Sequence, residues 1–241
     1  TGSGKTTTLY SALHKLNAVD TNIVTVEDPI EYELFGVNQV QVNSRIHFTF
    51  AEALRQILRQ DPDVVMVGEI RDGETADIAV KAALTGHLVL STLHTNDAAG
   101  AIARMVDMGV PPFLLASSVI LAQAQRLFRK LCTFCRTPTT VEHDTLAANR
   151  IPADFFDGAT VYEPKGCPKC NDIGYKGRGA LMEVLTVSDQ VREAIMHGEN
   201  SARIRELAIA DGMIPLKEVG LRKVRAGVTS LQAALEVTGS E

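Results

Sequence analysis

Aromatic residues are scarce in this sequence. Tryptophan is absent, and aromatic side chains make up 5% of the 241 residues. Stacking platforms for single-stranded nucleic acid are therefore not expected. Basic residues are not in excess either, because 24 Lys and Arg stand against 29 Asp and Glu and give a formal net charge of −5. Both features argue against nucleic acid as the main partner.

Long apolar runs are missing as well. No run reaches the length of a membrane span, and no signal peptide is recognisable. The apolar fraction of 45% and the charged fraction of 22% are typical of a soluble globular protein. The length allows one large domain, or one domain with a smaller appendage.

The first eight residues, Thr1-Gly-Ser-Gly-Lys-Thr-Thr-Thr, match the end of the phosphate-binding pattern G-x-x-x-x-G-K-[ST]. Gly2 and Gly4 let the backbone curl so that its N–H groups point inward. Lys5 reaches the β- and γ-phosphates, and the Thr6 hydroxyl can hold Mg²⁺. A helix should begin at about Lys5, with its positive end toward the phosphates. The alternative is a Gly/Ser-rich tail that matches by chance.

On this interpretation, nucleotide binding falls to Gly2, Ser3, Gly4, Lys5, Thr6 and Thr7, and the magnesium ligand is Thr6. The leading glycine of the pattern, and the strand that feeds such a loop, would come before Thr1. We therefore expect the chain to be part of a longer protein.

Two predicted strands end in acidic residues. The β-branched stretch 22–26 leads into Glu27 and Asp28, and the continuous apolar run 64–67 leads into Gly68-Glu69. An open α/β sheet places its chemistry at the carboxyl ends of its strands. A carboxylate at Glu69 can orient or deprotonate an attacking water, or hold Mg²⁺ through water. The alternative is an acid that caps the next helix.

Residues 86–97 predict another buried strand that contains two histidines, His87 and His94. Their offset of seven residues would point them to opposite faces of a regular strand. His94 lies at its carboxyl end, where a nucleotide would bind, and we predict that it contacts or senses the γ-phosphate. A single histidine is more often structural, and for His87 the structural interpretation is equally plausible.

The four cysteines form two pairs, Cys132-x-x-Cys135 and Cys167-x-x-Cys170, separated by the 31 residues 136–166. Paired C-x₂-C knuckles supply four thiolates for tetrahedral Zn²⁺, which leaves no open position for catalysis, so we predict a structural zinc site. Disulfides are the alternative, but they fit a cytosolic nucleotide enzyme poorly.

The other patterns predict mainly helices. An extended excursion or hairpin is expected over 32–42, and a strand over 177–185. Within the cysteine insert we expect a helical turn at 144–149 and a strand at 159–162. Helices are predicted at 6–17, 50–60, 74–84, from Asn96-Asp97 to Met108, 113–130, 188–197, 201–210, 214–225 and 230–237.

Four motifs occur in a fixed order, and together they resemble the bacterial secretion and pilus traffic ATPases, the motors of type II secretion and type IV pilus assembly. The motifs are Thr1-Gly-Ser-Gly-Lys-Thr-Thr-Thr8, Val24-Thr-Val-Glu-Asp-Pro-Ile-Glu-Tyr32, Arg59-Gln-Asp-Pro-Asp-Val-Val-Met-Val-Gly-Glu-Ile-Arg-Asp72 and Thr85-Gly-His-Leu-Val-Leu-Ser-Thr-Leu-His-Thr-Asn-Asp97. They are similar to the family's Walker A, Asp-box, Walker B and His-box. The resemblance covers essentially the whole chain, and the tetracysteine insert is similar to that of the pilus-extension and type II secretion branches.

The resemblance implies an α/β fold with a RecA-like P-loop core at 1–131, a tetracysteine zinc subdomain at 132–171, and a C-terminal strand and helical subdomain at 172–241. It implies Mg-dependent hydrolysis of ATP to ADP, with Glu69 as the catalytic carboxylate, Glu27 and Asp28 assisting, and His94 as the His-box residue. The implied setting is a homohexamer in the cytoplasm, at the inner-membrane face. The hexamer would be held at the membrane by partner proteins, without entering it, and would act on an inner-membrane platform protein.

Four functions stay open on the sequence alone. The lead interpretation is a motor for type IV pilus assembly, and the first alternative is a type II secretion motor. More distant alternatives are a nucleic-acid motor with a zinc ribbon, since RecA-like motors serve both purposes, and a non-catalytic interaction fragment. Salt-sensitive DNA binding would favour the nucleic-acid motor.

Overall fold

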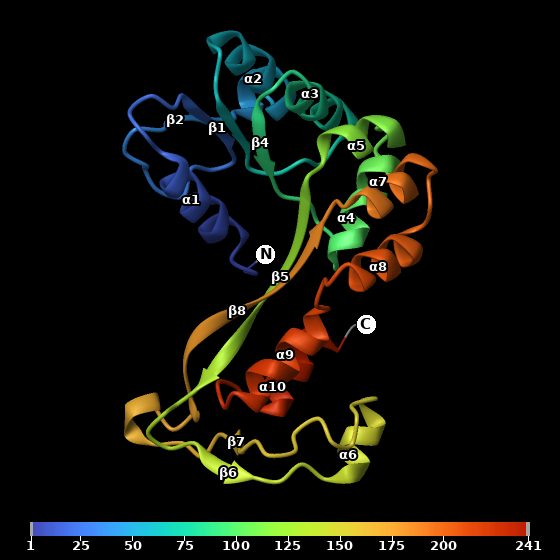
Figure 1. Ribbon diagram of the computed structural model, residues 1–241. Helices are drawn as coiled ribbons and strands as arrows, with labels where there is room; N and C mark the ends of the chain where they lie inside the picture. Colours follow the sequence, from blue (N-terminus) through green and yellow to red (C-terminus); the bar gives the residue numbers. More distant parts are fainter. Residues whose placement is uncertain (1, 240–241) are drawn as a thin grey trace. The chain divides into compact units, whose positions relative to one another are not determined.

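The computed structural model describes residues 2–239. Thr1, the first residue of the phosphate-binding motif, and residues 240–241 of the expected C-terminal subdomain lie outside the described part. The chain divides into two compact units, which Figure 1 shows with their elements labelled. We call them the sheet unit (Lys5–Gln123 and Val184–Met213) and the cysteine unit (Thr1–Gly4, Ala124–Glu183 and Ile214–Glu241).

The sheet unit holds a parallel sheet and most of the helices. Its elements are α1 (Lys5–Leu16), β1 (Ile23–Glu27), β2 (Asn38–Gln41), η1 (Ser44–Ile46), α2 (Phe50–Ile57), η2 (Leu58–Gln60), β3 (Val64–Val67), α3 (Gly73–Leu84), β4 (Leu88–Ser91), α4 (Ala98–Asp107), α5 (Pro112–Ser118), α7 (Asp189–Met196) and α8 (Ser201–Ala210).

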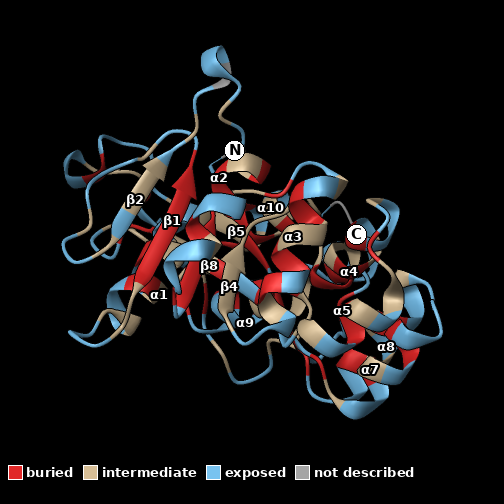
Figure 2. Ribbon diagram, turned by 90° about the horizontal axis from the view of Figure 1, so that it is seen from above, coloured by how far each residue is buried: buried red, intermediate tan, exposed pale blue. Residues whose placement is uncertain are grey.

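The sheet has the strand order β2-β1-β3-β4, and each described neighbouring pair is parallel. Every residue of β1 and of β3 is buried, as Figure 2 shows for β1 in red. Continuous apolar runs of this kind are typical of strands that are covered on both faces. Both predicted strands are confirmed, and so is the burial predicted for the run 64–67.

Helices cover both faces of this sheet. Tyr10 and Leu13 of α1 form a core cluster with Ile23, Val64 and Met66. Helix α2 contacts β1, α3 contacts β4, and Figure 1 shows both of them on the side away from α1. Side chains alternate between the faces of a strand, so the odd-numbered residues of β1, which include Glu27, face α1.

The cysteine unit is built from short elements around the cysteine pairs. They are β6 (Thr137–Thr139), α6 (His143–Ala148), β7 (Val161–Glu163), η3 (Pro168–Cys170), α9 (Leu216–Arg225) and α10 (Leu231–Thr238). Strands β6 and β7 pair antiparallel. The insert between the knuckles packs onto α9 and α10, where Val161 meets Val224 and Ala234.

The long helix predicted over 113–130 is wrong. The structure has the short α5, then β5 (Leu121–Leu131), which pairs with β8 (Tyr175–Thr186). Ala, Leu, Gln, Arg and Lys favour a helix locally, but pairing with a distant strand overrides that preference. Gly179 permits the pairing at one point, because a Cβ there would lie 2.6 Å from the ring of Phe128.

Two smaller predictions also need correction. Of the two alternatives expected over 32–42, a hairpin or an extended excursion, the hairpin with β1 does not form: a turn at Phe35-Gly36 leads into β2, which runs parallel to β1. The strand predicted over 86–97 is shorter than expected: β4 spans Leu88–Ser91 and is only partly buried, so both His87 and His94 lie outside it. The three-part division at 131/132 and 171/172 stays a prediction; the compact units are instead discontinuous in sequence, and β5 and β8 each contribute residues to both.

Among the described residues, no helix is both long and apolar enough to cross a membrane.

Candidate active site and cysteine cluster

The phosphate-binding motif has the backbone that the sequence predicts. Gly2 and Gly4 adopt φ values of 87° and 83°, in the left-handed region that favours glycine. Helix α1 begins at Lys5, and its first turn carries no acidic residue. Its free N–H groups and its dipole therefore favour an anion at this end.

Gln125 supports this turn, and sequence reasoning missed it. Its Nε2 atom donates to the carbonyl oxygen of Ser3 at 2.9 Å, and the residue is 6% exposed. Both residues belong to the cysteine unit. No local signal marks Gln125, because it lies in the stretch whose sequence predicts a helix.

Three of the predicted site residues, Asp28, Glu69 and His94, follow strands that end at one edge of the parallel sheet. The register pairs Val26 with Val67, and Val67 with Ser91. The segments that follow these strands therefore start side by side at the carboxyl edge. These segments carry Asp28, Glu69 and His94.

Glu69 and His94 are in direct contact, as their common edge predicts. The Glu69 side chain is 13% exposed, and its Oε2 atom lies 3.0 Å from Nε2 of His94. Since an ionised carboxylate can only accept, the imidazole nitrogen is the donor. The other oxygen, Oε1, accepts a hydrogen bond from Nη2 of Arg71.

These contacts keep Glu69 ionised. Burial alone raises the pKa of its carboxyl, but the hydrogen bonds from Arg71 and His94 outweigh burial, so that the pKa lies below its ordinary value. Asp28 is exposed, and its charge adds to the effect of Glu69 in raising the pKa of the Arg71 guanidinium. Arg71 is a site residue that sequence reasoning left without a role, although it stands two residues after the predicted carboxylate.

Glu27, which the sequence predicts to assist catalysis together with Asp28, is buried at the end of β1. It is 3% exposed and faces α1. Its carboxylate accepts hydrogen bonds from the Tyr10 hydroxyl, from Oγ1 of Thr25 at 2.6 Å and from Nε2 of Gln39 at 3.0 Å. The structure thus separates two neighbours that the sequence predicts to act together, with Asp28 exposed at the edge and Glu27 enclosed.

His87 has a structural environment. Its Nδ1 atom lies 3.0 Å from the carbonyl oxygen of Ala82 and 3.2 Å from Oγ1 of Thr85, at the end of α3. The two histidines therefore have different partners: His87 contacts the end of α3, and His94 contacts the Glu69 carboxylate.

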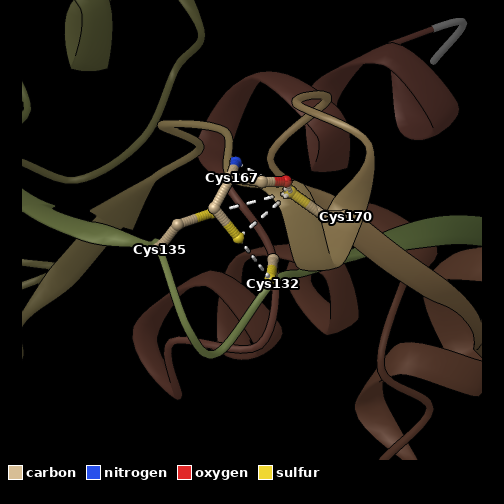
Figure 3. Close-up of side chains that lie close together, drawn as sticks. All are labelled: Cys132, Cys135, Cys167 and Cys170. Carbon is tan, nitrogen blue, oxygen red and sulfur yellow. Dashed lines mark hydrogen bonds between the residues drawn. The ribbon is translucent and has the colours of Figure 1, made fainter.

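The four cysteines converge on one point, which Figure 3 shows. Their Sγ atoms all lie within 4.8 Å of one another. Cys132 and Cys167 are 3.9 Å apart, Cys135 and Cys170 are 3.8 Å apart, and Cys167 and Cys170 are 3.7 Å apart. A disulfide needs about 2.05 Å between sulfurs. Four thiolates about 2.3 Å from a central Zn²⁺ would instead stand about 3.8 Å apart, so the donor set and its spacing fit tetrahedral zinc.

The backbone around the cluster favours the thiolate form at one cysteine. Cys170 Sγ accepts from the N–H of Cys167 at 3.2 Å and from that of Gly174 at 3.3 Å. Burial works against ionisation, but these donors and the neighbouring thiols lower the pKa of Cys170 to about 7. At Cys135 burial dominates and raises the pKa to about 12. The surroundings therefore favour the thiolate form at Cys170 over Cys135.

A parallel sheet with a glycine turn leading into α1 is the architecture of phosphate-loop α/β proteins. Within that class, the chain belongs to the family described as Type II/IV secretion system protein, which matches residues 1–236. This confirms the family that the four motifs resemble.

Two curated relatives show how close the similarity is. The chain is 54% identical over its whole length to "Type II secretion system protein E" of Dickeya dadantii (strain 3937), and 52% identical over its whole length to "Type IV pilus assembly ATPase PilB" of Myxococcus xanthus (strain DK1622). The chain covers 47% and 42% of these two proteins, so it spans less than half the length of either.

A solved structure shows the same fold. The "Crystal Structure of the Pilus Retraction Motor PilT and Bound ADP" matches 98% of this chain with a TM-score of 0.70 and 29% identity, and the match covers 58% of that protein. The α/β fold class predicted from the sequence is confirmed.

Proposed function

We propose that this chain is the ATP-hydrolysing part of a motor that drives type IV pilus assembly. The observation that carries the proposal is the Glu69 carboxylate, kept ionised by Arg71 and His94 at the carboxyl edge of the parallel sheet. The similarity to a pilus assembly ATPase over the whole chain supports it.

The direction of α1 brings its phosphate-binding end toward the same edge. Tyr10 of α1 contacts Glu27 at the carboxyl end of β1, while Leu13 packs with Ile23 at the start of that strand. Lys5 lies five residues before Tyr10, which is about 7 Å along a helix, so α1 begins beyond the edge of the sheet.

The proposed reaction is transfer of the γ-phosphoryl group from ATP to water. Glu69 orients the attacking water and accepts its proton as the new P–O bond forms and the bond to the β-phosphate oxygen breaks. Lys5 and the N–H groups of the phosphate loop stabilise the charge that builds on the phosphate oxygens. His94 contacts the γ-phosphate, and Asp28 assists from the loop after β1.

Thr6 is the residue that would hold magnesium. Its hydroxyl is exposed in the first turn of α1, and a hard oxygen donor is what Mg²⁺ prefers. The ion, when bound, would neutralise charge on the β- and γ-phosphates. Gly2, Ser3, Gly4 and Thr7 complete the proposed nucleotide contacts with Lys5 and Thr6.

We assign a structural role to zinc at Cys132, Cys135, Cys167 and Cys170. Four thiolates complete a tetrahedral site and leave no position for a substrate. The two knuckles are far apart in sequence, so an ion bound there would tie the ends of the insert together.

The setting follows the family resemblance. We propose a homohexamer that works in the cytoplasm, at the inner-membrane face, through an inner-membrane platform protein. Nucleic acid is not part of this proposal, in keeping with the net charge of −5 and the few aromatic residues.

A type II secretion motor is the second candidate, because the identity to a type II secretion E protein is 54% over the whole chain. Deleting the gene in its own host separates the two. Loss of surface pili with normal protein secretion supports pilus assembly, and loss of secreted proteins with normal pili supports secretion.

The test of the catalytic assignment is Glu69→Gln in the full-length protein. ATP turnover should fall to background while binding of a fluorescent ATP analogue is retained, because the amide cannot accept the proton. Glu74→Gln is the matched control, since Glu74 is an exposed carboxylate with its own partner, Arg55. Undiminished turnover in Glu69→Gln would overturn the assignment.

A further inference from the structure

Gln125 of β5 holds a backbone carbonyl of the phosphate-binding turn, residues 2–4. Its Nε2 atom lies 2.9 Å from the carbonyl oxygen of Ser3, and the residue is 6% exposed. A carbonyl oxygen can only accept a hydrogen bond, so the amide group of Gln125 is the donor. The contact joins two residues of the cysteine unit that are 122 positions apart in the sequence.

The same strand also packs closely against the next residue of the turn. A Cβ atom added at Gly4 would lie 2.9 Å from Nε2 of Gln125 and 3.3 Å from Cδ2 of Leu127. Gln125 and Leu127 are two residues apart on β5, so their side chains leave the same face of the strand. The turn therefore rests on one face of β5, and the glycine at position 4 permits this close approach.

The bond to Ser3 fixes the direction of the N–H group that follows it. The carbonyl of Ser3 and the N–H of Gly4 belong to one planar trans peptide unit, in which the two groups point in opposite directions. Holding the oxygen toward Gln125 therefore aims the N–H of Gly4 away from Gln125. In a phosphate-binding loop the N–H groups converge on the anion, whereas a flipped peptide unit would present its carbonyl oxygen to the phosphates.

We propose that Gln125 is a positioning residue for nucleotide binding, which acts through Ser3 to keep the N–H of Gly4 turned toward the phosphates. This inference rests on the proposed ATP hydrolysis. A glutamine suits the role, because its amide supplies a donor without a charge that would need a partner when buried. The donor also stands on a strand that pairs with β8, and a rigid element holds a site more precisely than a loop does.

The test compares Gln125→Met and Gln125→Glu with the unchanged full-length protein, with KM, kcat and the Kd for ATP and for ADP as readouts. Gln125→Met keeps the length of the side chain but removes the donor. The affinity for both nucleotides should then fall about fivefold, because the peptide unit is no longer held in one orientation. Gln125→Glu places an acceptor and a negative charge against the Ser3 oxygen, so it should weaken binding further.

The balance between KM and kcat tests the positioning role itself. The loop contacts the phosphates both before and during the reaction, so KM should rise with Kd while kcat changes less than about twofold. A side chain that only stabilises the fold predicts a different pattern. Gln125→Met would then lower Tm but leave Kd and KM for ATP unchanged, and that result would overturn the proposal.

Gln232→Met is the matched control. Gln232 is an exposed glutamine of α10 in the same unit, and its Nε2 atom donates to Glu236. Its Kd for ATP should equal that of the unchanged protein. An equal loss of affinity in Gln232→Met and Gln125→Met would overturn the assignment to Gln125.

Hydrogen exchange separates failure of this proposal from failure of the proposed function. Without nucleotide, a peptide covering residues 2–9 should exchange faster in Gln125→Met, because the turn is no longer anchored to β5, and at an unchanged rate in Gln232→Met. This readout needs neither ATP binding nor hydrolysis. Equal exchange in Gln125→Met and the unchanged protein would overturn the positioning role, whereas an unchanged protein that hydrolyses no ATP would overturn only the proposed function.

Discussion

The Nε2 atom of His94 lies 3.0 Å from Oε2 of Glu69, although the two residues follow different strands. The contact exists because β3 and β4 are parallel neighbours whose carboxyl ends share one edge of the sheet. With Arg71 on the other oxygen, the carboxylate is held between two donors. A group held in this way is oriented and ionised before any substrate arrives.

The first prediction concerns the pH dependence of ATP hydrolysis. In the proposed mechanism the ionised form of Glu69 is the active form, and Arg71 helps to keep the pKa of this carboxyl below the ordinary value. Arg71→Ala should therefore raise this pKa and move the acidic limb of the profile of kcat/KM against pH to higher pH.

Arg203→Ala is the control, because Arg203 is an exposed arginine of α8 that pairs with Glu206 and lies outside all four motifs. Its acidic limb should match that of the unchanged protein. An acidic limb that stays in place in Arg71→Ala would show that Arg71 does not control the ionisation of Glu69.

The second prediction concerns the phosphate-binding turn. Gly4→Ala places a Cβ at a φ of 83°, 2.9 Å from Nε2 of Gln125. Left-handed strain alone costs about 1–2 kcal/mol, so ATP affinity should fall about tenfold or more in an equilibrium binding assay. Gly212→Ala introduces left-handed strain in an open turn, at a φ of 101° with no atom within 4 Å, and should leave ATP affinity unchanged.

The third prediction concerns the cysteine cluster. The purified protein should contain one zinc per chain by elemental analysis, and Cys170→Ser should lose most of it. Because binding free energy at such a site is folding free energy, Tm should fall by about 5 °C or more in Cys170→Ser. Thr133→Ala, an exposed change between the first two cysteines, should keep both the zinc and the Tm. A metal-free protein with unchanged Tm would contradict a structural role.

The fourth prediction concerns Glu183, a fully buried carboxylate of β8. Its Oε2 atom accepts from the backbone N–H of Leu216 at 3.1 Å, at the start of α9. Glu183→Ala leaves that donor without its partner and should lower the free energy of unfolding by about 2 kcal/mol in a denaturant titration. Glu236→Ala removes an exposed partner of Arg129 and should cost less than about 1 kcal/mol. Equal costs would contradict the assignment.

The sequence predicted the parts of the site that depend on local patterns. Gly4 and Lys5 predict a turn followed by a helix. The apolar run 64–67 predicts a buried strand, and Glu69 comes just after it. Parallel pairing then brings Glu69 and His94 to a common edge, because the carboxyl ends of parallel strands coincide. The cysteine spacing likewise predicted the cluster, since thiol ligands leave a clear sequence signature.

What the sequence could not show depends on partners distant in the chain. Residues 121–131 are good helix formers, and only their pairing with β8 makes them a strand. From the sequence, Glu27 and Asp28 look alike, as two acids at the end of a strand. Only the tertiary fold distinguishes them, because it brings Tyr10 and Gln39 against Glu27. Gln125 likewise gains its role from Ser3, which lies 122 residues away in the chain.

The arrangement of the sheet also bears on how the molecule becomes active during folding. Lys5, Asp28, Glu69 and His94 come from four separate stretches, and only the completed parallel pairing of β1, β3 and β4 assembles the last three. A nascent chain that ends before residue 88 carries the phosphate-binding motif and Glu69, but it lacks both β4 and His94. Non-local strand pairings of this kind form late, because the entropy of loop closure must be overcome first. We therefore expect the Glu69–His94 contact to form only after β3 and β4 have paired.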